Sequence, residues 1–366
     1  MLKIPTFLLC LFLALCAAAP VFAANEPDLA NHPIYAKYQF GREGKVVDMG
    51  SPPLSAPMGV IGGVMQHDQI LHKALAERGW ELRIHDFLKG ADGPFFFQRG
   101  DLDLAIIGDF PAIALAASYD ILVTALAKQG FVSILGKNMS QMAQLRGKRI
   151  GVSKGTVAHY NLLIALEFFG LTESDVTPVF LEFSEMPEAL AQGRVDAIVA
   201  LEPYTSYTLK LHPEYKVTQR LLYQGYLCFS KKFVTDNPEI AELMVAAYIR
   251  ALRWMRQSNA NLMQAVGWDL AAGERLLGKP TGLSPQDMAR ITTEELLKIV
   301  QSPMVPRQDL AENGVIRRIY AFLQKQGKIP AGVSWEKVAA SFDRTLTEKV
   351  LAAPKQYRLL DFDYDK

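Results

Sequence analysis

The sequence has little cysteine, little excess charge and, beyond its first residues, no apolar run long enough to cross a membrane. Of its 3 cysteines, Cys10 and Cys16 lie in the apolar N-terminal segment, which leaves Cys228 alone. We expect Cys228 to be a buried, small apolar side chain and not part of a disulfide. The formal net charge of +1 lacks the basic surplus that nucleic acids and anionic membranes attract, so we expect neither as a partner.

Sequence motifs of several common chemistries are also missing. The 6 histidines show neither H-x-x-x-H nor H-E-x-x-H spacing, so we expect no metal site. There is no Gly-x-Ser-x-Gly elbow for a hydrolytic serine, and Ser153 precedes a glycine without an identifiable base. The glycines at 62–63 lie inside a predicted helix and lack the Lys-Ser/Thr ending of a phosphate-binding loop. We therefore expect no catalytic residue, no cofactor and no enzyme.

Residues 1–23 have the pattern of a secretory signal peptide. Lys3 precedes an apolar run at 7–19, and small side chains end the segment, which places cleavage before Ala24. The apolar run is short for a membrane span of about 20 residues. A large residue precedes Cys16, so we expect no lipid attachment there. These features predict export to the periplasm.

The rest of the chain alternates short apolar strands with amphipathic helices. With 366 residues, 50% of them hydrophobic, it can bury the cores of two or three domains. The pattern predicts strands at 46–49, 80–85, 102–107, 149–152, 179–183 and 197–201. It predicts helices at 56–78, 94–99, 156–169, 187–192, 238–257, 259–267, 269–276, 284–300, 307–326 and 335–342, with a further one ending at Ser118. This alternation is typical of an α/β fold with a mostly parallel sheet.

Two extended apolar segments, 121–135 and 217–229, bracket the second group of strands. They suggest two α/β lobes that are joined by two long strands. We expect residues 25–44 to be a loose N-terminal segment, and the tail 354–366 to wrap the surface.

The clearest candidate site lies in the strand–turn–helix stretch 148–170. Gly155 frees the turn, and Thr156 is the expected helix N-cap. The free N–H groups of such a helix start attract anions, and His159 would add a switchable charge or a neutral hydrogen bond. Apolar residues at helical spacing are expected to form one packed face: Leu162, Leu163, Leu166 and Phe169. Most such junctions in α/β proteins bind nothing, so this stretch alone defines no ligand.

Other polar groups stand at the ends of predicted strands, where ligands bind in open α/β sheets. They are Ser51, Gly108, Asp109 and Glu202. Helix starts after Gly108 and Gly155 would favour an anion, whereas Glu202 would favour a cation or N–H donors or would simply be solvated. Together these groups fit a small anion or a zwitterion held between two lobes.

The motifs that carry a family resemblance follow one another over roughly residues 45–345. They are GDLD at 100–103, GDFP at 108–111, LRGKRIG at 145–151, KGT-x-x-HY at 154–160, GRVDA at 193–197 and EPY at 202–204. In their order and spacing the chain resembles the periplasmic solute-binding proteins of nitrate, taurine and aliphatic sulfonate uptake systems. This family belongs to the superfamily of the thiamine-pyrimidine-precursor binders.

The resemblance implies a type II periplasmic binding protein, with two α/β lobes, two extended crossover strands and a helical C-terminal region. One lobe would contain 40–127 together with 225–366, and the other 128–224. A monomer would close on a small solute and deliver it to an ABC permease. Carried over by position, the ligand-binding residues would be Ser51, Gly108, Asp109, Phe110, Thr156, Val157, His159 and Glu202.

An acidic residue at Glu202 beside a sulfonate pocket would suit an amine-bearing ligand such as taurine.

Two alternative functions remain open at this point. The chain could instead be a ligand-sensing lobe for a membrane sensor, or a pyrimidine-precursor binder or synthase. The synthases of this superfamily use a cysteine-rich, metal-dependent site, which the lone Cys228 and the export signal argue against.

Overall fold

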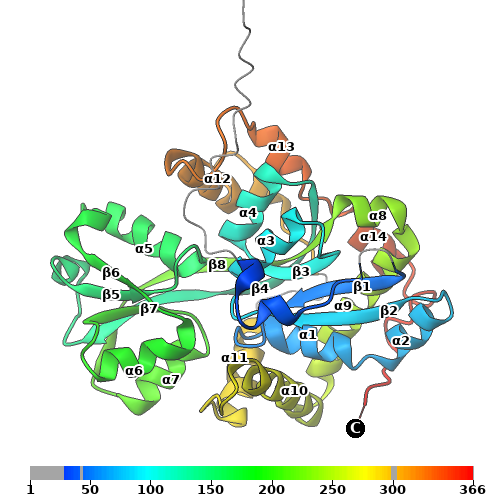
Figure 1. Ribbon diagram of the computed structural model, residues 1–366, viewed down its shortest axis with the longest axis horizontal. Helices are drawn as coiled ribbons and strands as arrows, with labels where there is room; N and C mark the ends of the chain where they lie inside the picture. Colours follow the sequence, from blue (N-terminus) through cyan, green and yellow to red (C-terminus); the bar gives the residue numbers. More distant parts are fainter. Residues whose placement is uncertain (1–28, 42–43, 298–302, 366) are drawn as a thin grey trace, which may run out of the picture.

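The computed structural model of the chain describes residues 29–41, 44–297 and 303–365. The predicted signal segment 1–23 lies outside these residues. Within the described chain, 8 strands form one sheet in the order β2-β1-β3-β8-β4-β7-β5-β6 (Figure 1). The strands are β1 (Val46–Ser51), β2 (Glu81–Asp86), β3 (Leu104–Gly108), β4 (Ile121–Lys137), β5 (Arg149–Val152), β6 (Thr177–Phe180), β7 (Ala197–Ala200) and β8 (Tyr215–Ser230).

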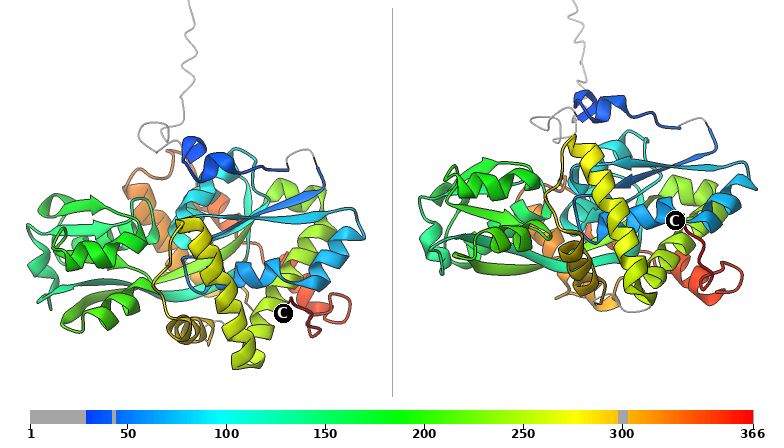
Figure 2. Two further views of the ribbon diagram at one scale, coloured as in Figure 1. Left: turned by 60° about the horizontal axis from the view of Figure 1, so that its bottom comes forward. Right: turned by 90° about the horizontal axis from the view of Figure 1, so that it is seen from below.

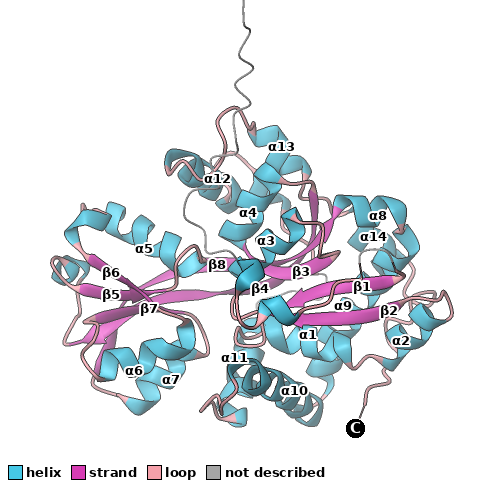
Figure 3. Cartoon of the chain, viewed as in Figure 1, coloured by secondary structure: helices cyan, strands magenta, loops and turns pink. Residues whose placement is uncertain are grey.

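Helices cover both faces of this sheet (Figure 3). The first are α1 (Met58–Gln66), α2 (Gln69–Ala76), α3 (Gly93–Gln98), α4 (Asp109–Ser118), α5 (Val157–Phe168), α6 (Met186–Ala191) and α7 (Tyr204–Leu211). The remainder are α8 (Lys231–Asp236), α9 (Pro238–Gln257), α10 (Asn259–Leu277), α11 (Pro285–Leu297), α12 (Val315–Lys325), α13 (Trp335–Ala340) and α14 (Thr345–Ala352). Among the described residues, no helix combines the length and the apolar character that crossing a membrane requires.

The two long strands β4 and β8 join the halves of the molecule. They pair antiparallel along their length, from Ile121 opposite Ser230 to Lys137 opposite Tyr215. Strands β5, β6 and β7 with α5, α6 and α7 form the small lobe, on the left of Figure 1. Strands β1, β2 and β3 form the large lobe with the remaining helices, as the two views of Figure 2 also show. The predicted arrangement of two lobes and two crossover strands is therefore confirmed.

Strand direction follows from the connections. Within each lobe the short strands pair parallel, β1 with β2 and β3, and β5 with β6 and β7. Each of these strands is followed by a helical connection, which returns the chain to the same edge of the sheet. The long strands pair antiparallel with β3, with β7 and with each other. The sheet is parallel inside each lobe and antiparallel where the lobes are joined.

Three predicted helical regions have wrong boundaries. The helix expected at 56–78 is two helices, because the buried Asp68 accepts a hydrogen bond from the N–H of Leu71 (3.0 Å) and caps α2. The Asp68 carboxylate also pairs with Arg250 at 2.7 Å. Conversely, α10 runs without a break through Gly267, which had suggested a division. The helix expected at 307–326 is a short 3-10 turn at Arg307–Leu310 followed by α12. Helices α7, α8 and α14 were not predicted, and part of the helix expected at 284–300 lies outside the described residues.

Burial confirms some packing predictions and corrects others. Cys228 is fully buried, as predicted. On α5, Leu162 and Leu166 are buried, but Phe169, at the C-cap of the helix, is 45% exposed and lies outside the packed face. The segment 29–41 was expected to be loose, yet its Tyr35 is only 3% exposed and belongs to the core of the large lobe.

Candidate ligand-binding site

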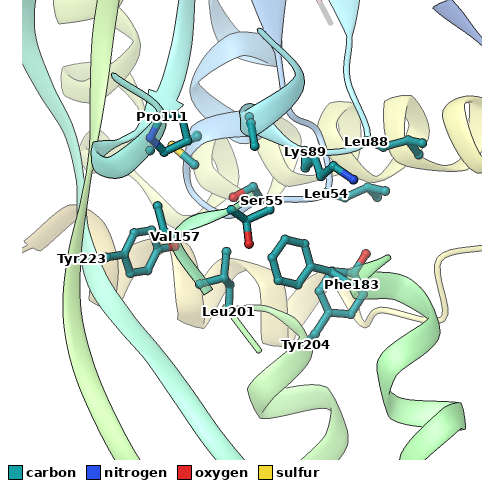
Figure 4. A pocket seen from close by; sticks show the side chains of 15 residues that line it. Leu54, Ser55, Leu88, Lys89, Pro111, Val157, Phe183, Leu201, Tyr204 and Tyr223 are labelled. Carbon is teal, nitrogen blue, oxygen red and sulfur yellow. The ribbon is translucent and has the colours of Figure 1, made fainter. Parts of the chain in front are cut away.

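A cavity lies between the two lobes, with an empty volume of about 460 Å³ that includes space open to solvent. Its walls come from the loops that follow β1, β2 and β3 in the large lobe and β5, β6 and β7 in the small lobe (Figure 4). The large lobe contributes Leu54, Ser55, Met58, Leu88, Lys89, Gly90, Ala91, Gly108 and Pro111. The other side is formed by Thr156, Val157, Phe183, Leu201, Tyr204 and, on β8, Tyr223.

Four helices begin at this cavity. Lining residues stand at the first helical position or at the N-cap of each: Met58 in α1, Gly108 in α4, Thr156 in α5 and Tyr204 in α7. None of these four starts has a side-chain hydrogen bond from its N-cap residue. Free N–H groups and the helix dipoles therefore converge on the cavity and favour negative charge in it.

Two of the four helix starts carry an acidic side chain of their own. In α4, the Asp109 carboxylate accepts a hydrogen bond from the N–H of Phe110 at 2.9 Å. In α7, Glu202 accepts from the N–H of Ser206 at 3.1 Å. The starts of α1 in the large lobe and of α5 in the small lobe have no acidic residue in their first turns. These two starts are therefore the better anion sites.

Lys89 is the one positively charged side chain among the residues that line the cavity. Its Nζ lies 2.5 Å from Oε1 of Glu182, which belongs to the small lobe. The pair is partly shielded, with the Lys89 side chain 18% exposed and that of Glu182 35% exposed. It therefore joins the two lobes at the rim of the cavity.

The two tyrosines of the cavity have buried hydroxyl groups. Neither the Tyr204 hydroxyl nor the Tyr223 hydroxyl makes a hydrogen bond within the described residues. Burial raises the pKa of both phenols, and nearby carboxylates raise it further: Asp269 and Glu182 for Tyr204, and Glu295, Asp109 and Glu202 for Tyr223. Both hydroxyls stay protonated, so a ligand could accept from them or donate to them.

Much of the remaining wall is apolar. Leu54, Leu88 and Pro111 come from the large lobe, and Phe183 and Leu201 face them from the small lobe (Figure 4). Such a lining favours an organic body on the ligand, with a few polar groups that fix its orientation.

Of the eight predicted site residues, Gly108, Thr156 and Val157 line the cavity. Gly108 and Val157 face each other across the lobes, since a Cβ at Gly108 would lie 2.6 Å from Cγ1 of Val157. Thr156 occupies the N-cap position, but its hydroxyl donates to the carbonyl of Ser153 (2.7 Å) and does not cap the helix. The predicted N-cap position is correct, but no side-chain capping bond forms, because the hydroxyl is turned toward the Ser153 carbonyl and away from the N–H groups of α5.

Three other predicted residues lie behind the cavity wall. Ser51 is 2% exposed and faces α1, where a Cβ at Gly62 would lie 2.2 Å from its Oγ. The Asp109 carboxylate also accepts from the N–H of Gln224 at 2.8 Å. Burial raises the pKa of Asp109 to about 7, although these hydrogen bonds lower it. Phe110 stacks on a ring of the small lobe, Tyr160, at 5.1 Å between centroids.

His159 and Glu202 are likewise not among the residues that line the cavity. His159 Nδ1 accepts from the N–H of Gly155 at 3.3 Å, and its Nε2 lies 3.4 Å from Oε1 of Glu173. Burial lowers the pKa of His159, and Glu173 opposes this shift. His159 therefore supports the turn before α5 with a neutral imidazole.

Several residues of the cavity were missed by the sequence reading. Leu88 to Ala91 directly follow β2, so the rule that ligands bind beyond the carboxyl ends of strands pointed to this loop as well. Tyr223 lies in the middle of β8, where no local signal marks it. Among the described residues, no group of three potential metal ligands was found.

Comparisons with known proteins agree with this architecture. Residues 121–260 match the protein family described as NMT1/THI5 like. A putative aliphatic sulfonates-binding protein of Escherichia coli is 31% identical over 160 residues, which are 41% of this chain and 49% of that protein. The chain thus spans about half the length of this relative. The taurine-binding periplasmic protein of Escherichia coli is 24% identical over 278 residues, or 70% of this chain and 81% of that protein.

A solved structure extends the similarity to most of the chain. The periplasmic aliphatic sulphonate binding protein SsuA from Escherichia coli superposes with a TM-score of 0.60 at 19% identity, covering 83% of this chain and 99% of that one. At this identity the superposition establishes the fold, and the predicted periplasmic binding protein fold is confirmed. The resemblance inferred from the sequence is confirmed as well, since the proteins to which this chain is similar include an aliphatic sulfonates-binding protein and a taurine-binding periplasmic protein.

Proposed function

We propose that the chain is the extracytoplasmic substrate-binding component of an ABC importer. It clamps a small anionic or zwitterionic solute, of the sulfonate, taurine or nitrate type, between its lobes. The observation that carries this proposal is the cavity between the lobes, at which α1 of one lobe and α5 of the other begin without a side-chain cap or an acidic residue in the first turn. The names of the relatives support the same role. In this proposal the exported protein acts as a monomer in the periplasm, delivers its solute to the permease subunits and catalyses no reaction.

The anionic group of the solute would bind between the starts of α1 and α5. One belongs to the large lobe and the other to the small lobe, so an anion there would attract both lobes at once. Ser55 supplies a hydroxyl group near the start of α1. Gly108 and Val157 belong to this part of the site, whereas Ser51, Asp109, Phe110, His159 and Glu202 would act by supporting it.

Of the solutes in the proposal, one with both an organic body and an amine fits best. The apolar wall would contact the body. The Tyr204 and Tyr223 hydroxyls, which make no hydrogen bond within the described residues, can accept a hydrogen bond from a protonated amine in the cavity. Taurine has these features, whereas nitrate has neither.

The lobes would move about the two long strands. We propose a boundary at Lys128 and Gly225, with 40–127 and 225–366 in one lobe and 128–224 in the other. These two residues pair across β4 and β8, and the pairing shifts register just before them, between Leu126 and Lys128. Such an irregularity bends and twists a strand locally. A solute that contacts both lobes shifts the equilibrium toward closure by its difference in affinity for the two states.

Thermal-shift and calorimetric titrations of the purified protein with a matched panel test this function. The panel contains taurine, ethanesulfonate (the same sulfonate without an amine), nitrate and an aminopyrimidine. A ligand at 100 times its dissociation constant adds about 2.7 kcal/mol of stability, which raises Tm by several degrees.

We expect taurine to give the larger shift and ethanesulfonate a smaller one. Equal affinities for these two compounds would contradict the amine preference and leave the sulfonate site. Binding of the aminopyrimidine alone would overturn the proposed solute class. If no compound of the panel binds, the proposed class of substrates is contradicted as a whole.

A further inference from the structure

The N-terminal strap, residues 29–41, reaches the ligand cavity through one loop of the large lobe. In Figure 1 the strap is the dark-blue segment where the two lobes meet. The Tyr35 ring packs edge-on against Phe87 at 5.2 Å and against Phe96 at 5.7 Å between centroids. Tyr38 donates a hydrogen bond to the carbonyl of Asp86. The strap is therefore anchored on both sides of the point where β2 ends.

The Tyr35 hydroxyl holds the loop that follows. It donates to Oδ2 of Asp92 at 2.6 Å and accepts from the N–H of Leu88 at 2.9 Å. These two partners stand at the ends of the short turn 88–92. The residues of the turn up to Ala91 line the cavity, and Asp92 is only 5% exposed. One hydroxyl thus fixes both ends of a cavity wall.

This turn presents Lys89 to the other lobe. The ammonium of Lys89 contacts Glu182 at 2.5 Å, and this ion pair joins the turn to the loop after β6. His32 of the strap also interacts with both charges: burial is the main cause that lowers the pKa of its imidazole, Glu182 raises this pKa and Lys89 lowers it. The strap, the turn and the ion pair therefore form one continuous connection from the N-terminus of the described chain to the small lobe.

We infer that Tyr35 is a positioning residue for lobe closure: it holds the turn so that Lys89 meets Glu182 across the cleft. Without the hydroxyl, the turn keeps its apolar packing but loses the two hydrogen bonds that fix the position of Lys89 relative to Glu182. The N-terminal strap is then part of the binding machinery. This inference rests on the proposed closure between lobes and does not depend on which solute binds.

The distance between spin labels on the two lobes tests the inference without any ligand. Labels are placed at Phe168→Cys in the small lobe and Lys232→Cys in the large lobe, both with 80% exposed side chains. Cys228 is fully buried and stays unlabelled. The unliganded protein is measured in four backgrounds: unchanged, Tyr35→Phe, Glu182→Gln and both together.

Tyr320→Phe is the matched control. Its buried hydroxyl also donates, to the carbonyl of Val333 at 2.7 Å, and accepts, from Gln324 at 3.4 Å, but it lies on α12 away from the cavity wall. It therefore reports what the loss of such a hydroxyl does to stability alone.

We expect the ratio of closed to open protein to fall at least threefold in Tyr35→Phe and in Glu182→Gln, and to remain unchanged in Tyr320→Phe. Because both changes break one connection, the double variant should match the single variants. The inference is overturned if Tyr35→Phe leaves the ratio unchanged, if the control lowers it equally, if the two effects multiply, or if the unliganded protein is entirely open. If no compound of the ligand panel binds, the proposed function is contradicted, but the distances between the labels still test the role of Tyr35.

Discussion

The starts of α4 and α5 face each other across the cleft and differ in one respect that decides their chemistry. Each follows a parallel strand, and the N-cap residue of each lines the cavity. In α4 the next residue is Asp109, whose carboxylate accepts from two backbone N–H groups. In α5 the next residue is Val157, and the nearby polar side chains bond within the turn.

The comparison shows that a strand–turn–helix pattern does not by itself make an anion site. The Asp109 carboxyl group in the first turn of α4 occupies the N–H of Phe110, which an anion would otherwise bind. At the start of α5, the backbone N–H groups remain available to a ligand. From the sequence, both helix starts were expected to favour an anion equally. The structure shows that their backbone N–H donors differ in availability.

Gly108→Ala should have the largest effect, because it tests whether the two helix starts must approach each other. The new methyl group would lie 2.6 Å from Val157 Cγ1 and 3.8 Å from the next nearest contact, Pro111. Overpacking of this kind costs about 1–3 kcal/mol, so we expect ligand affinity to fall at least tenfold, the equivalent of about 1.4 kcal/mol. Calorimetric titration with the best ligand of the panel measures it.

The double variant Gly108→Ala with Val157→Ala is the control, since it removes the clashing methyl. It should recover most of the lost affinity. Failure of the second change to restore binding would mean that Gly108 matters for another reason than the approach of α5.

Asp109→Asn tests the α4 side through pH. The pKa of Asp109 is raised from 3.8 to about 7 by burial. Between these values the unfolded chain has lost its proton while the folded chain keeps it, so stability falls as pH rises from about 4 to about 7. The asparagine variant should lack this part of the slope, which amounts to at most about 1.4 kcal/mol per pH unit. Urea unfolding across this range measures it, and identical slopes would show that Asp109 is ionised in the folded protein.

His159→Gln tests the α5 side and should have the smallest effect. The pKa of His159 is lowered below 6.5, mainly by burial. Stability from the neutral imidazole is therefore present above pH 6.5 and is lost as pH falls through the folded pKa, because the unfolded chain binds the proton first. We expect the variant to lose this acid sensitivity. Its free energy of unfolding at neutral pH should decrease by about 1 kcal/mol, because the hydrogen bond to Gly155 is lost. An NMR titration of His159 with a midpoint above 6.5 would refute this sign.

Much of the fold could be predicted from the sequence because its signals are local. The strand at 149–152 and the helix at 238–257 match β5 and α9, and the long apolar segments match β4 and β8. Errors arose where a tertiary contact overrode a local signal. Asp68 ends a helix because Arg250, far along the chain, stabilises its buried carboxylate.

The candidate site was less predictable, since its members meet only in the folded chain. Gly108, Thr156 and Val157 line the cavity and could be found from strand ends. Lys89 and Glu182 are ordinary charged residues until the two lobes bring them within 2.5 Å. Asp109 looked like a site residue, but its carboxylate turns to the backbone of β8.

The alternation of strands and helices, the two long connections and hence the two lobes follow from local sequence, because hydrophobic period and turn residues act over short distances. Which helix starts are open, which tyrosines line the cavity and which ion pair crosses it follow from the packing of the folded chain. Those properties depend on distances between segments that are remote in sequence, and on the burial that their packing creates.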